Sequence, residues 1–187
     1  ERSTLCISSQ VGCRQACTFC LTGRMGLLQS LTVDEILSQV YWAAKVCRTR
    51  DIYPIDNIVF MGLGVSSILA SPFEKIVSAF SSVYATLSDS SEFPDLSVGK
   101  EPADNPINVV LAANNLVDQH LFALTPHKIT ISTVGPTPES FEVLGEASAV
   151  LAWSVHASRD SLRQQLVPTT QYSMVELREG LLRALHK

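Results

Sequence analysis

Residues 4–20 read Thr-Leu-Cys-Ile-Ser-Ser-Gln-Val-Gly-Cys-Arg-Gln-Ala-Cys-Thr-Phe-Cys, and this stretch decides the fold. Its first part, residues 4–11, alternates weakly and is rich in β-compatible residues, which predicts a strand. Its second part places Cys13, Cys17 and Cys20 in a C-x3-C-x2-C spacing. We therefore expect a strand whose carboxyl end runs directly into a loop of three cysteines.

Three thiolates on one tight loop can hold three irons of a cubane iron–sulfur cluster, whereas an electron-transfer cluster normally takes four protein cysteines. The remaining iron then stays open to a small molecule. A structural zinc site is the main alternative, but such sites usually close with four ligands, commonly from two pairs. Here the other cysteines are Cys6 and Cys47, and the four histidines are not closely paired. The odd count of five cysteines also disfavours a disulfide framework, so an iron–sulfur cluster ranks ahead of zinc, and zinc ahead of inert thiols.

The composition is that of one globular domain. The chain has 187 residues, of which 46% are hydrophobic and 17% charged. No apolar stretch approaches the roughly 20 residues that span a bilayer, and no signal-peptide pattern is present. Because the chain begins at Glu1 without a methionine, we expect an internal piece of a longer protein. The net charge of -4 disfavours a broad RNA-binding surface on this piece, since phosphate contacts need clustered Lys and Arg.

Strands and helices are expected to alternate along the rest of the chain. Further strands are predicted at 57–61, 128–133 and 150–156, and helices at 33–47, 105–116 and 138–144, from 158 to the break at 168, and from 173 onward. Capping boxes mark two helix starts, Thr32 with Glu35 and Ser173 with Glu176, while Asn105 is predicted to cap a third. Four strand-helix units predict an α/β fold with a parallel sheet inside and helices outside. A closed eight-unit barrel needs about 250 residues, so a partial barrel, truncated at both ends, is expected.

The ordered motifs resemble the RlmN/Cfr family of radical S-adenosylmethionine (SAM) adenosine methyltransferases. The matching segments are residues 4–13, 17–20, 22–23, 61–64, 131–135, 151–157, 162–163 and 167–168. The resemblance implies a partial TIM-like barrel of the radical SAM type, a 4Fe-4S cluster and SAM as cofactors, and methylation of adenosine C2 in 23S ribosomal RNA and in some cases tRNA. A subfamily methylates C8 instead. The cysteine motif is shared by many radical SAM enzymes, whereas the ordered flanking motifs are far more discriminating.

One segment departs from the family pattern. The family's glycine turn continues directly into Glu-Pro, whereas here Gly64 is followed by Val65, and Glu-Pro appears only at Glu101. Removing the 36 residues from Val65 to Lys100, ten of which are serine, restores the family motif without a gap. We hypothesise a translated retained intron at 65–100, which would make the source eukaryotic. The alternative is an inserted surface loop, since closure entropy grows slowly with loop length. Sequencing the spliced transcript decides between them, and an mRNA that always carries the segment would refute the intron.

The resemblance implies a site for the cluster and for SAM. Cys13, Cys17 and Cys20 are the expected cluster ligands. The residues expected to contact SAM are Phe19, Gly64, Glu101, Ser132, Ser154, Val155 and His156. Gly64 and Glu101 can act together only if the intervening segment loops out. On residue chemistry alone, Phe19 is also a possible core aromatic, Ser132 a turn residue, and His156 a satisfied, partly buried histidine.

Cys6 is the expected catalytic residue. By itself it reads as a buried strand cysteine. In the resembling family the cysteine at this position helps to resolve a covalent RNA–enzyme adduct that a second, C-terminal cysteine forms with its methyl group. No cysteine follows Cys47, which is expected to be structural, and the family's upstream glutamate is also absent. The chain alone is therefore not expected to complete turnover.

The expected partners follow from the same resemblance. They are an RNA substrate held mainly by segments outside this chain and an electron donor such as flavodoxin or ferredoxin. The protein is expected to be a monomer with no membrane partner, cytoplasmic by family, or in a plastid or mitochondrion if the source is eukaryotic. Two alternatives stay open: another radical SAM enzyme that acts on a small molecule or peptide, and a zinc-stabilised binding module without catalysis. C2 versus C8 and ribosomal RNA versus tRNA also stay open.

Overall fold

A four-stranded parallel sheet forms the centre of the computed structural model, which describes residues 3–20, 22–24, 26–61, 98–99 and 101–186. Its strand order is β1 (Ser3–Ile7), β4 (Ile55–Phe60), β6 (Ile129–Thr133) and β7 (Val150–Trp153). Every neighbouring pair is parallel, with register partners such as Cys6 and Val59. Because each strand follows its neighbour in sequence order, the sheet grows in one direction, as in an incomplete barrel.

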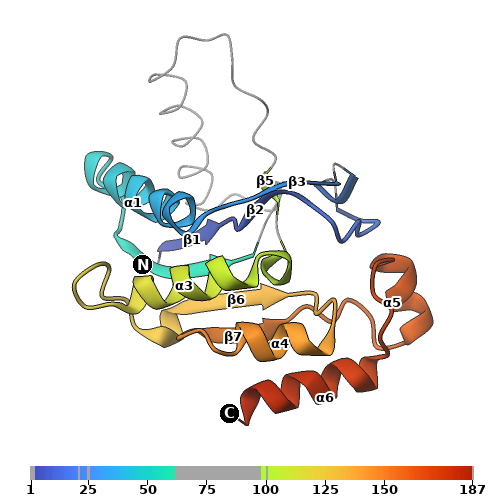
Figure 1. Cartoon of the computed structure of the whole chain (residues 1–187). Coiled ribbons are helices and arrows are strands. Elements are labelled where there is room, and N and C mark those ends of the chain that lie inside the picture. Colours follow the sequence, from blue (N-terminus) through green and yellow to red (C-terminus); the bar gives the residue numbers. More distant parts are fainter. Residues whose placement is uncertain (1–2, 21, 25, 62–97, 100, 187) are drawn as a thin grey trace.

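Helices connect the strands and cover one face of this sheet (Figure 1). They are α1 (Val33–Thr49), α3 (Pro106–Val117) and α4 (Pro138–Leu144), followed beyond β7 by α5 (Asp160–Leu166) and α6 (Met174–Leu185). Short 3-10 turns are η1 (Thr22–Arg24), η2 (Pro102–Asp104) and η3 (Pro126–Lys128). The expected α/β architecture, with a parallel sheet inside and helices outside, is confirmed. None of the described helices is long and apolar enough to cross a membrane.

Alternation along the strands separates the two faces of the sheet. The main core contains Ile7 of β1, Ile58 and Phe60 of β4, and Ile131 of β6, all packed toward the helices. The neighbouring residues in each strand point to the other face, where Cys6, Val59 and Ser132 are only half-buried. The helix-covered face thus supplies the apolar stabilisation, and the other face carries small and polar side chains.

The predicted strand at 4–11 is two strands. β1 ends at Ile7, and β2 (Gln10–Cys13) belongs to a separate antiparallel sheet with β3 (Gly26–Ser30) and β5 (Val98–Gly99). The break lies at Ser8, whose N–H donates to Gln39 Oε1 at 3.0 Å and whose carbonyl accepts from Gln39 Nε2 at 3.0 Å. The Gln39 side chain, on α1, therefore replaces the ladder hydrogen bonds that a continuous strand would make.

The helix starts follow their capping signals with one exception. Both capping boxes are present, Thr32 with Glu35 and Ser173 with Glu176. Asn105 occupies the N-cap position of α3 but makes no side-chain cap hydrogen bond. Its Nδ2 donates instead to the carbonyls of Ser9 and Leu31, each at 2.7 Å. The asparagine thus joins the helix to the small sheet.

Other boundaries differ from expectation by a few residues. β7 ends at Trp153, so residues 154–156 follow the strand instead of belonging to it. The helix expected from 158 begins at Asp160 and ends at Leu166, before Pro168. Cys47 is buried on α1, as expected of a structural cysteine. Of the segment 65–100, only residues 98 and 99 are described, and they pair with β2 as β5.

Candidate active site at the carboxyl end of the sheet

The cysteine loop follows β2 and reaches η1 and β3. Cys13 is the last residue of β2 and pairs with Gly26. Cys17 and Cys20 are joined by a turn, in which the Cys20 N–H donates to the Cys17 carbonyl at 3.0 Å. Figure 1 shows the loop in blue beyond β2, above α5. The cysteines are thus held at the end of the small sheet, not at the end of β1 as the sequence suggested.

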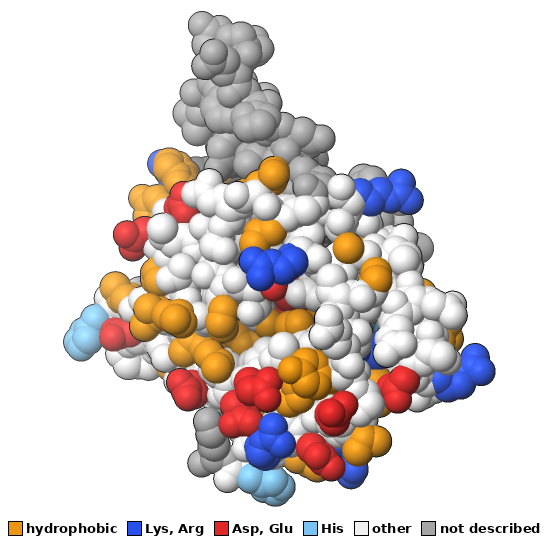
Figure 2. All heavy atoms as spheres, turned by 45° about the vertical axis from the view of Figure 1, so that its right-hand side comes forward, with side chains coloured by type: hydrophobic (Ala, Val, Ile, Leu, Met, Phe, Trp, Pro, Cys, Tyr) orange, Lys and Arg blue, Asp and Glu red, His pale blue; other side chains and the backbone are white. Residues whose placement is uncertain are grey.

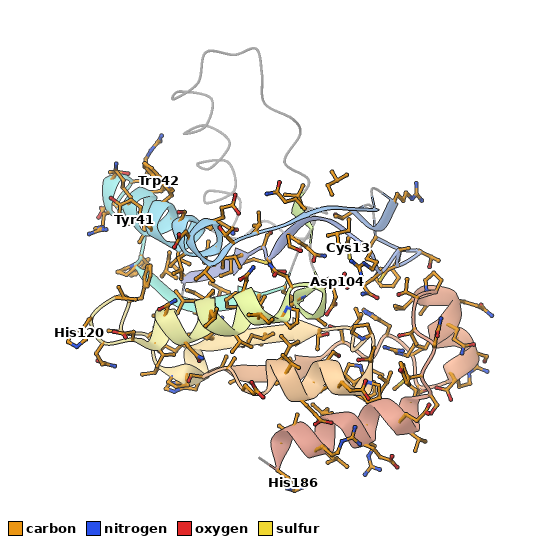
Figure 3. All side chains as sticks on the ribbon, viewed as in Figure 1. Cys13, Tyr41, Trp42, Asp104, His120 and His186 are labelled. Atoms are coloured by element: carbon orange, nitrogen blue, oxygen red, sulfur yellow. The ribbon has the colours of Figure 1, made fainter. Side chains whose placement is uncertain are left out.

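A buried glutamine anchors this loop to two distant segments. Gln15 Nε2 donates to Asp104 Oδ1 at 3.1 Å, and Gln15 Oε1 accepts from the Thr169 hydroxyl at 2.6 Å. Separately, the Thr18 N–H donates to the Leu166 carbonyl of α5 at 2.9 Å. Cys13 and Asp104 lie at the same end of the molecule in Figure 3, and they interact electrostatically. Sequence reasoning missed Gln15, because a glutamine between cysteines carries no signal of burial.

Burial dominates the electrostatics of the cysteines. It raises the pKa of Cys13 to about 12 and that of Cys17 to about 11. The thiols also sense one another, since Cys17 raises the pKa of Cys13 and Cys20 raises that of Cys17, whereas the Arg163 guanidinium lowers that of Cys17. Three mutually interacting thiols fit an iron–sulfur cluster in donor chemistry. In the described part of the chain, however, no three His, Cys, Asp or Glu side chains are already gathered into a metal-binding group.

An aromatic contact joins the cysteine loop to the end of β7. The rings of Phe19 and His156 lie 5.0 Å apart between centroids, tilted by 54°. Phe19 is 57% exposed, so it is not a core aromatic. His156 has a positive φ of 62°, a left-handed conformation that orients its backbone at the strand end. His156 is exposed to solvent, but its partial desolvation and then the Arg163 guanidinium lower its pKa, which favours the neutral imidazole.

Two serine hydroxyls meet beside this contact. Ser132 Oγ of β6 and Ser154 Oγ, just beyond β7, are 3.0 Å apart. The Ser154 N–H donates to the Thr133 carbonyl at 2.8 Å, which continues the sheet one residue past β7. Val155 follows on the surface. Four of the expected SAM residues therefore lie together at the carboxyl ends of β6 and β7, where ligands of parallel α/β folds gather.

Glu101 lies buried behind these strand ends. Its carboxylate accepts hydrogen bonds from the Thr133 hydroxyl, from the Val134 N–H at 3.0 Å and from the Ala103 N–H at 3.1 Å. Burial raises the pKa of Glu101 to about 7, against the opposing effect of these donors. Gly64, its expected partner, lies outside the described residues. The role of the pair in SAM binding stays a prediction.

Arg163 was not singled out from the sequence, although it is the most deeply buried charged side chain described, at 1% exposure. It is held on α5, and its Nη2 donates to the Val134 carbonyl, which also accepts from Trp153 Nε1 at 3.1 Å. Its guanidinium lies 5.9 Å from the centroid of the Trp153 ring. The backbone of one residue, Val134, therefore bonds Glu101 through its N–H and Arg163 through its carbonyl.

Cys6 lies apart from the cysteine loop. Its Sγ donates to the Met61 carbonyl at 2.8 Å, across the ends of β1 and β4. It is half-buried on the sheet face that the helices do not cover. Ser132 is half-buried on this same face of the sheet, so the Cys6 thiol and the Ser132 hydroxyl lie on one side of it. Its catalytic role stays a prediction.

One face of the molecule shows no gathered group of basic side chains. On the face shown in Figure 2, Lys and Arg side chains lie at separated places among acidic and apolar ones. This scatter agrees with the net charge of -4 for the whole chain. The visible face is therefore not a phosphate-binding patch.

Comparison with known proteins relates this chain to methyltransferases. No protein-family model matches the sequence. A probable RNA methyltransferase of Sorangium cellulosum is 35% identical over 185 residues, which are 98% of this chain and 37% of that protein. A crystal structure of a radical SAM methyltransferase from Sphaerobacter thermophilus superposes with a TM-score of 0.73 at 28% identity. That match covers 99% of this chain and 44% of the other.

These likenesses define the class. The chain has the fold of the radical SAM core and is related to radical SAM and RNA methyltransferases. It spans less than half of the length of the proteins that it matches. The activity and substrate of a complete protein are accordingly taken up as a proposal.

Proposed function

We propose that the chain is the core of a radical SAM methyltransferase of the RlmN/Cfr type, which acts on C2 of an adenosine in 23S ribosomal RNA, with an adenosine in tRNA as a second target. The observation that carries the proposal is the contact between Phe19 of the cysteine loop and His156 at the end of β7. It sets the expected cluster loop beside the serine pair Ser132 and Ser154. A cluster and its SAM must be neighbours, so this adjacency is what the chemistry requires.

Cys13, Cys17 and Cys20 would hold the 4Fe-4S cluster. When bound, the cluster supplies the electron that cleaves SAM to a 5'-deoxyadenosyl radical. Radical chemistry suits this target because C2 of adenine is a poor nucleophile. The substrate base must also leave its stack to reach a buried site, as base-modifying enzymes require.

The remaining residues would bind and orient SAM. Phe19 offers an exposed ring that can stack on the SAM adenine. The hydroxyls of Ser132 and Ser154 are placed to donate to ribose or carboxylate oxygens. The neutral imidazole of His156 can accept or donate one hydrogen bond beside them.

Two further residues have more distant roles. Glu101 bonds the Thr133 hydroxyl and the Val134 N–H, so it fixes the turn after β6 whether or not it also reaches SAM with Gly64. Cys6 faces the uncovered side of the sheet, where an RNA base would enter a completed barrel. We assign it the resolution of a covalent RNA adduct.

The proposal also covers the partners. The RNA would be bound mainly by parts of a longer protein, because this chain is acidic overall. Flavodoxin or ferredoxin would donate the electron to a monomeric enzyme. The location would be the cytoplasm, or an organelle in a eukaryote.

Anaerobic reconstitution with iron and sulfide tests the cluster first. We expect a broad sulfur-to-iron charge-transfer absorption, and formation of 5'-deoxyadenosine when SAM and dithionite are added. Separate Cys13→Ser, Cys17→Ser and Cys20→Ser variants should lose both signals, while Cys47→Ser, a matched change of a buried cysteine outside the loop, should keep them. Binding of zinc in place of iron would refute the proposal.

The RNA target is tested with the longer protein. Ribosomal RNA and tRNA are offered separately, and the methylated nucleoside is identified by mass spectrometry. We expect 2-methyladenosine. Methylation at C8 would correct the position, and modification of a small molecule or peptide alone would refute the RNA assignment.

A further inference from the structure

Arg163 is an unusual residue in this site because its charge is buried without a matching anion. Only 1% of the residue is exposed, yet Nε and Nη1 have no hydrogen-bond partner within the residues that the structure describes. The third nitrogen, Nη2, donates to a neutral carbonyl, that of Val134. Burying an uncompensated guanidinium costs several kcal/mol, of the order of the penalty for any unpaired buried ion.

The carboxylates near Arg163 do not neutralise it directly. Asp160, one turn earlier on α5, acts on it electrostatically, but its Oδ1 accepts from the Met174 N–H at 2.7 Å. Glu101 bonds the N–H of Val134, whereas Arg163 bonds its carbonyl, so the backbone of this residue lies between the two side chains. Trp153 offers its ring at 5.9 Å, which is a weak partner for a full charge.

The guanidinium instead acts electrostatically on the cysteine loop. Arg163 and Cys17 interact electrostatically, and both are buried. The helix that carries Arg163 is fixed to the loop, because the Thr18 N–H donates to the Leu166 carbonyl at 2.9 Å. Arg163 also acts on His156, which contacts Phe19. The unpaired charge is therefore carried by a helix that is hydrogen-bonded to the cysteine loop, and it acts on both Cys17 and His156.

We propose that Arg163 is the buried counter-charge of the cluster: its positive charge, with two unpartnered N–H groups, favours cluster uptake and makes the cluster easier to reduce. A cubane cluster held by three thiolates carries a net negative charge that grows on reduction. A fixed cation nearby stabilises the reduced form more than the oxidised form, which raises the reduction potential. This inference rests on the proposed function, and Arg163 is a positioning residue in it.

The test compares the reduction potential of the reconstituted chain with that of two Arg163 variants, in a redox titration monitored by electron paramagnetic resonance. Arg163→Met removes the charge and keeps much of the apolar volume, and we expect a more negative potential and a lower cluster content. Arg163→Lys keeps the charge and should stay close to the wild type. Arg159→Met removes an exposed arginine at the start of the same helix and should change neither quantity.

Thermal unfolding of the cluster-free chain separates this role from a purely structural one. Arg163→Met should unfold at the same temperature as the wild type or higher, because apolar replacement of an unpaired buried ion is neutral or stabilising. The Val134 carbonyl keeps its hydrogen bond from Trp153 Nε1. A variant that unfolds well below the wild type without a cluster would show a structural role and overturn the inference.

The outcomes also separate this inference from the proposed function. A wild-type chain that takes up no cluster refutes both. A loaded wild type whose potential is unchanged in Arg163→Met refutes the counter-charge alone. If Arg163→Met fails to load while its cluster-free form is as stable as the wild type, the requirement for the charge is supported.

Discussion

Gly12 is a residue whose identity is fixed by the backbone just before the cysteine loop. Its φ is +74°, and an added Cβ would lie 1.9 Å from the Gly26 carbonyl oxygen. Gly26 has a similar φ of +70°, but a Cβ there would meet nothing within 4 Å. An added Cβ would therefore cost similar backbone strain at both glycines. Only at Gly12 would it also clash with the neighbouring strand.

We expect Gly12→Ala to destabilise the chain far more than Gly26→Ala. The left-handed conformation costs an L-residue about 1 kcal/mol at either position. At Gly12 the β2–β3 pairing must also open to admit the methyl group. Urea unfolding of both variants measures the difference, and equal losses would contradict the close approach of β2 and β3.

Glu101 makes stability depend on pH. Burial raises its folded pKa to about 7, above the ordinary 4.5. A group with a raised folded pKa stabilises the fold fully below its unfolded pKa and loses that contribution as the pH rises through the folded pKa. We therefore expect the free energy of unfolding to fall between about pH 4.5 and pH 7, by at most ~1.4 kcal/mol per pH unit.

The variant Glu101→Gln should remove this part of the pH dependence. Its amide oxygen can still accept from the Val134 N–H, so the turn after β6 keeps its main tie. Unfolding of both chains is followed from pH 4 to pH 8. A wild-type chain whose stability rises across this range would contradict a raised pKa.

At the scale of elements, the junction between β1 and β2 depends on one side chain of α1. Gln39 bonds both backbone groups of Ser8, so it holds the turn that lets β2 leave the parallel sheet. We expect Gln39→Ala to cost about 1–3 kcal/mol, the penalty for leaving buried backbone groups unsatisfied. Ser38→Ala, an exposed change on the same helix, should cost little.

Hydrogen exchange locates this effect. In Gln39→Ala we expect amide hydrogens of residues 7–13 to exchange faster than in the wild type. Exchange in β4 and β6 should be unchanged. Uniformly faster exchange over the whole parallel sheet would mean that Gln39 supports the core and not the junction.

The same junction shows which features the sequence could predict and which it could not. Both capping boxes and the alternation of strands with helices are local patterns, so they were predicted. The end of β1 is set by Gln39, about thirty residues away, and the role of Asn105 is set by carbonyls at Ser9 and Leu31. Such long-range partners produce no pattern in the sequence around the residue. The strands β3 and β5, which pair with β2, were not predicted for the same reason.

At the scale of the whole molecule, the candidate site joins segments from both ends of the chain. The family motifs named Phe19, Ser132, Ser154 and His156, and the fold brings these residues together. The resemblance gave no role to Gln15, nor to Arg163 although it lies in the matching segment 162–163, because each acts through burial and through partners distant in sequence. The sequence thus indicated the residues that we propose to lie beside the cofactors, and the structure adds residues that hold the cysteine loop in place.

The Gln15 side chain links these distant segments most directly. Its side chain connects the cysteine loop to Asp104 before α3 and to Thr169 after α5. In Gln15→Leu the side-chain volume is nearly kept, but Asp104 Oδ1 loses its hydrogen-bond donor, and the Thr169 hydroxyl keeps only the longer bond to the Gln15 carbonyl, at 3.2 Å. We expect a loss of about 1–3 kcal/mol in the free energy of unfolding. Gln171→Leu, an exposed glutamine beside the same hollow, is the matched control and should cost less than about 0.5 kcal/mol.

Limited proteolysis then distinguishes a local opening from global destabilisation. If Gln15 ties the loop to the rest of the molecule, cleavage in Gln15→Leu should begin after Arg14, at a denaturant concentration where the parallel sheet is still folded. This follows because Arg14 is exposed and its loop would lose both Gln15 side-chain bonds, while it keeps the bond from the Thr18 N–H to α5 and that from the Thr169 hydroxyl to the Gln15 carbonyl. Cleavage that starts within α3 or α6 instead would show that the loop and the sheet unfold as one unit.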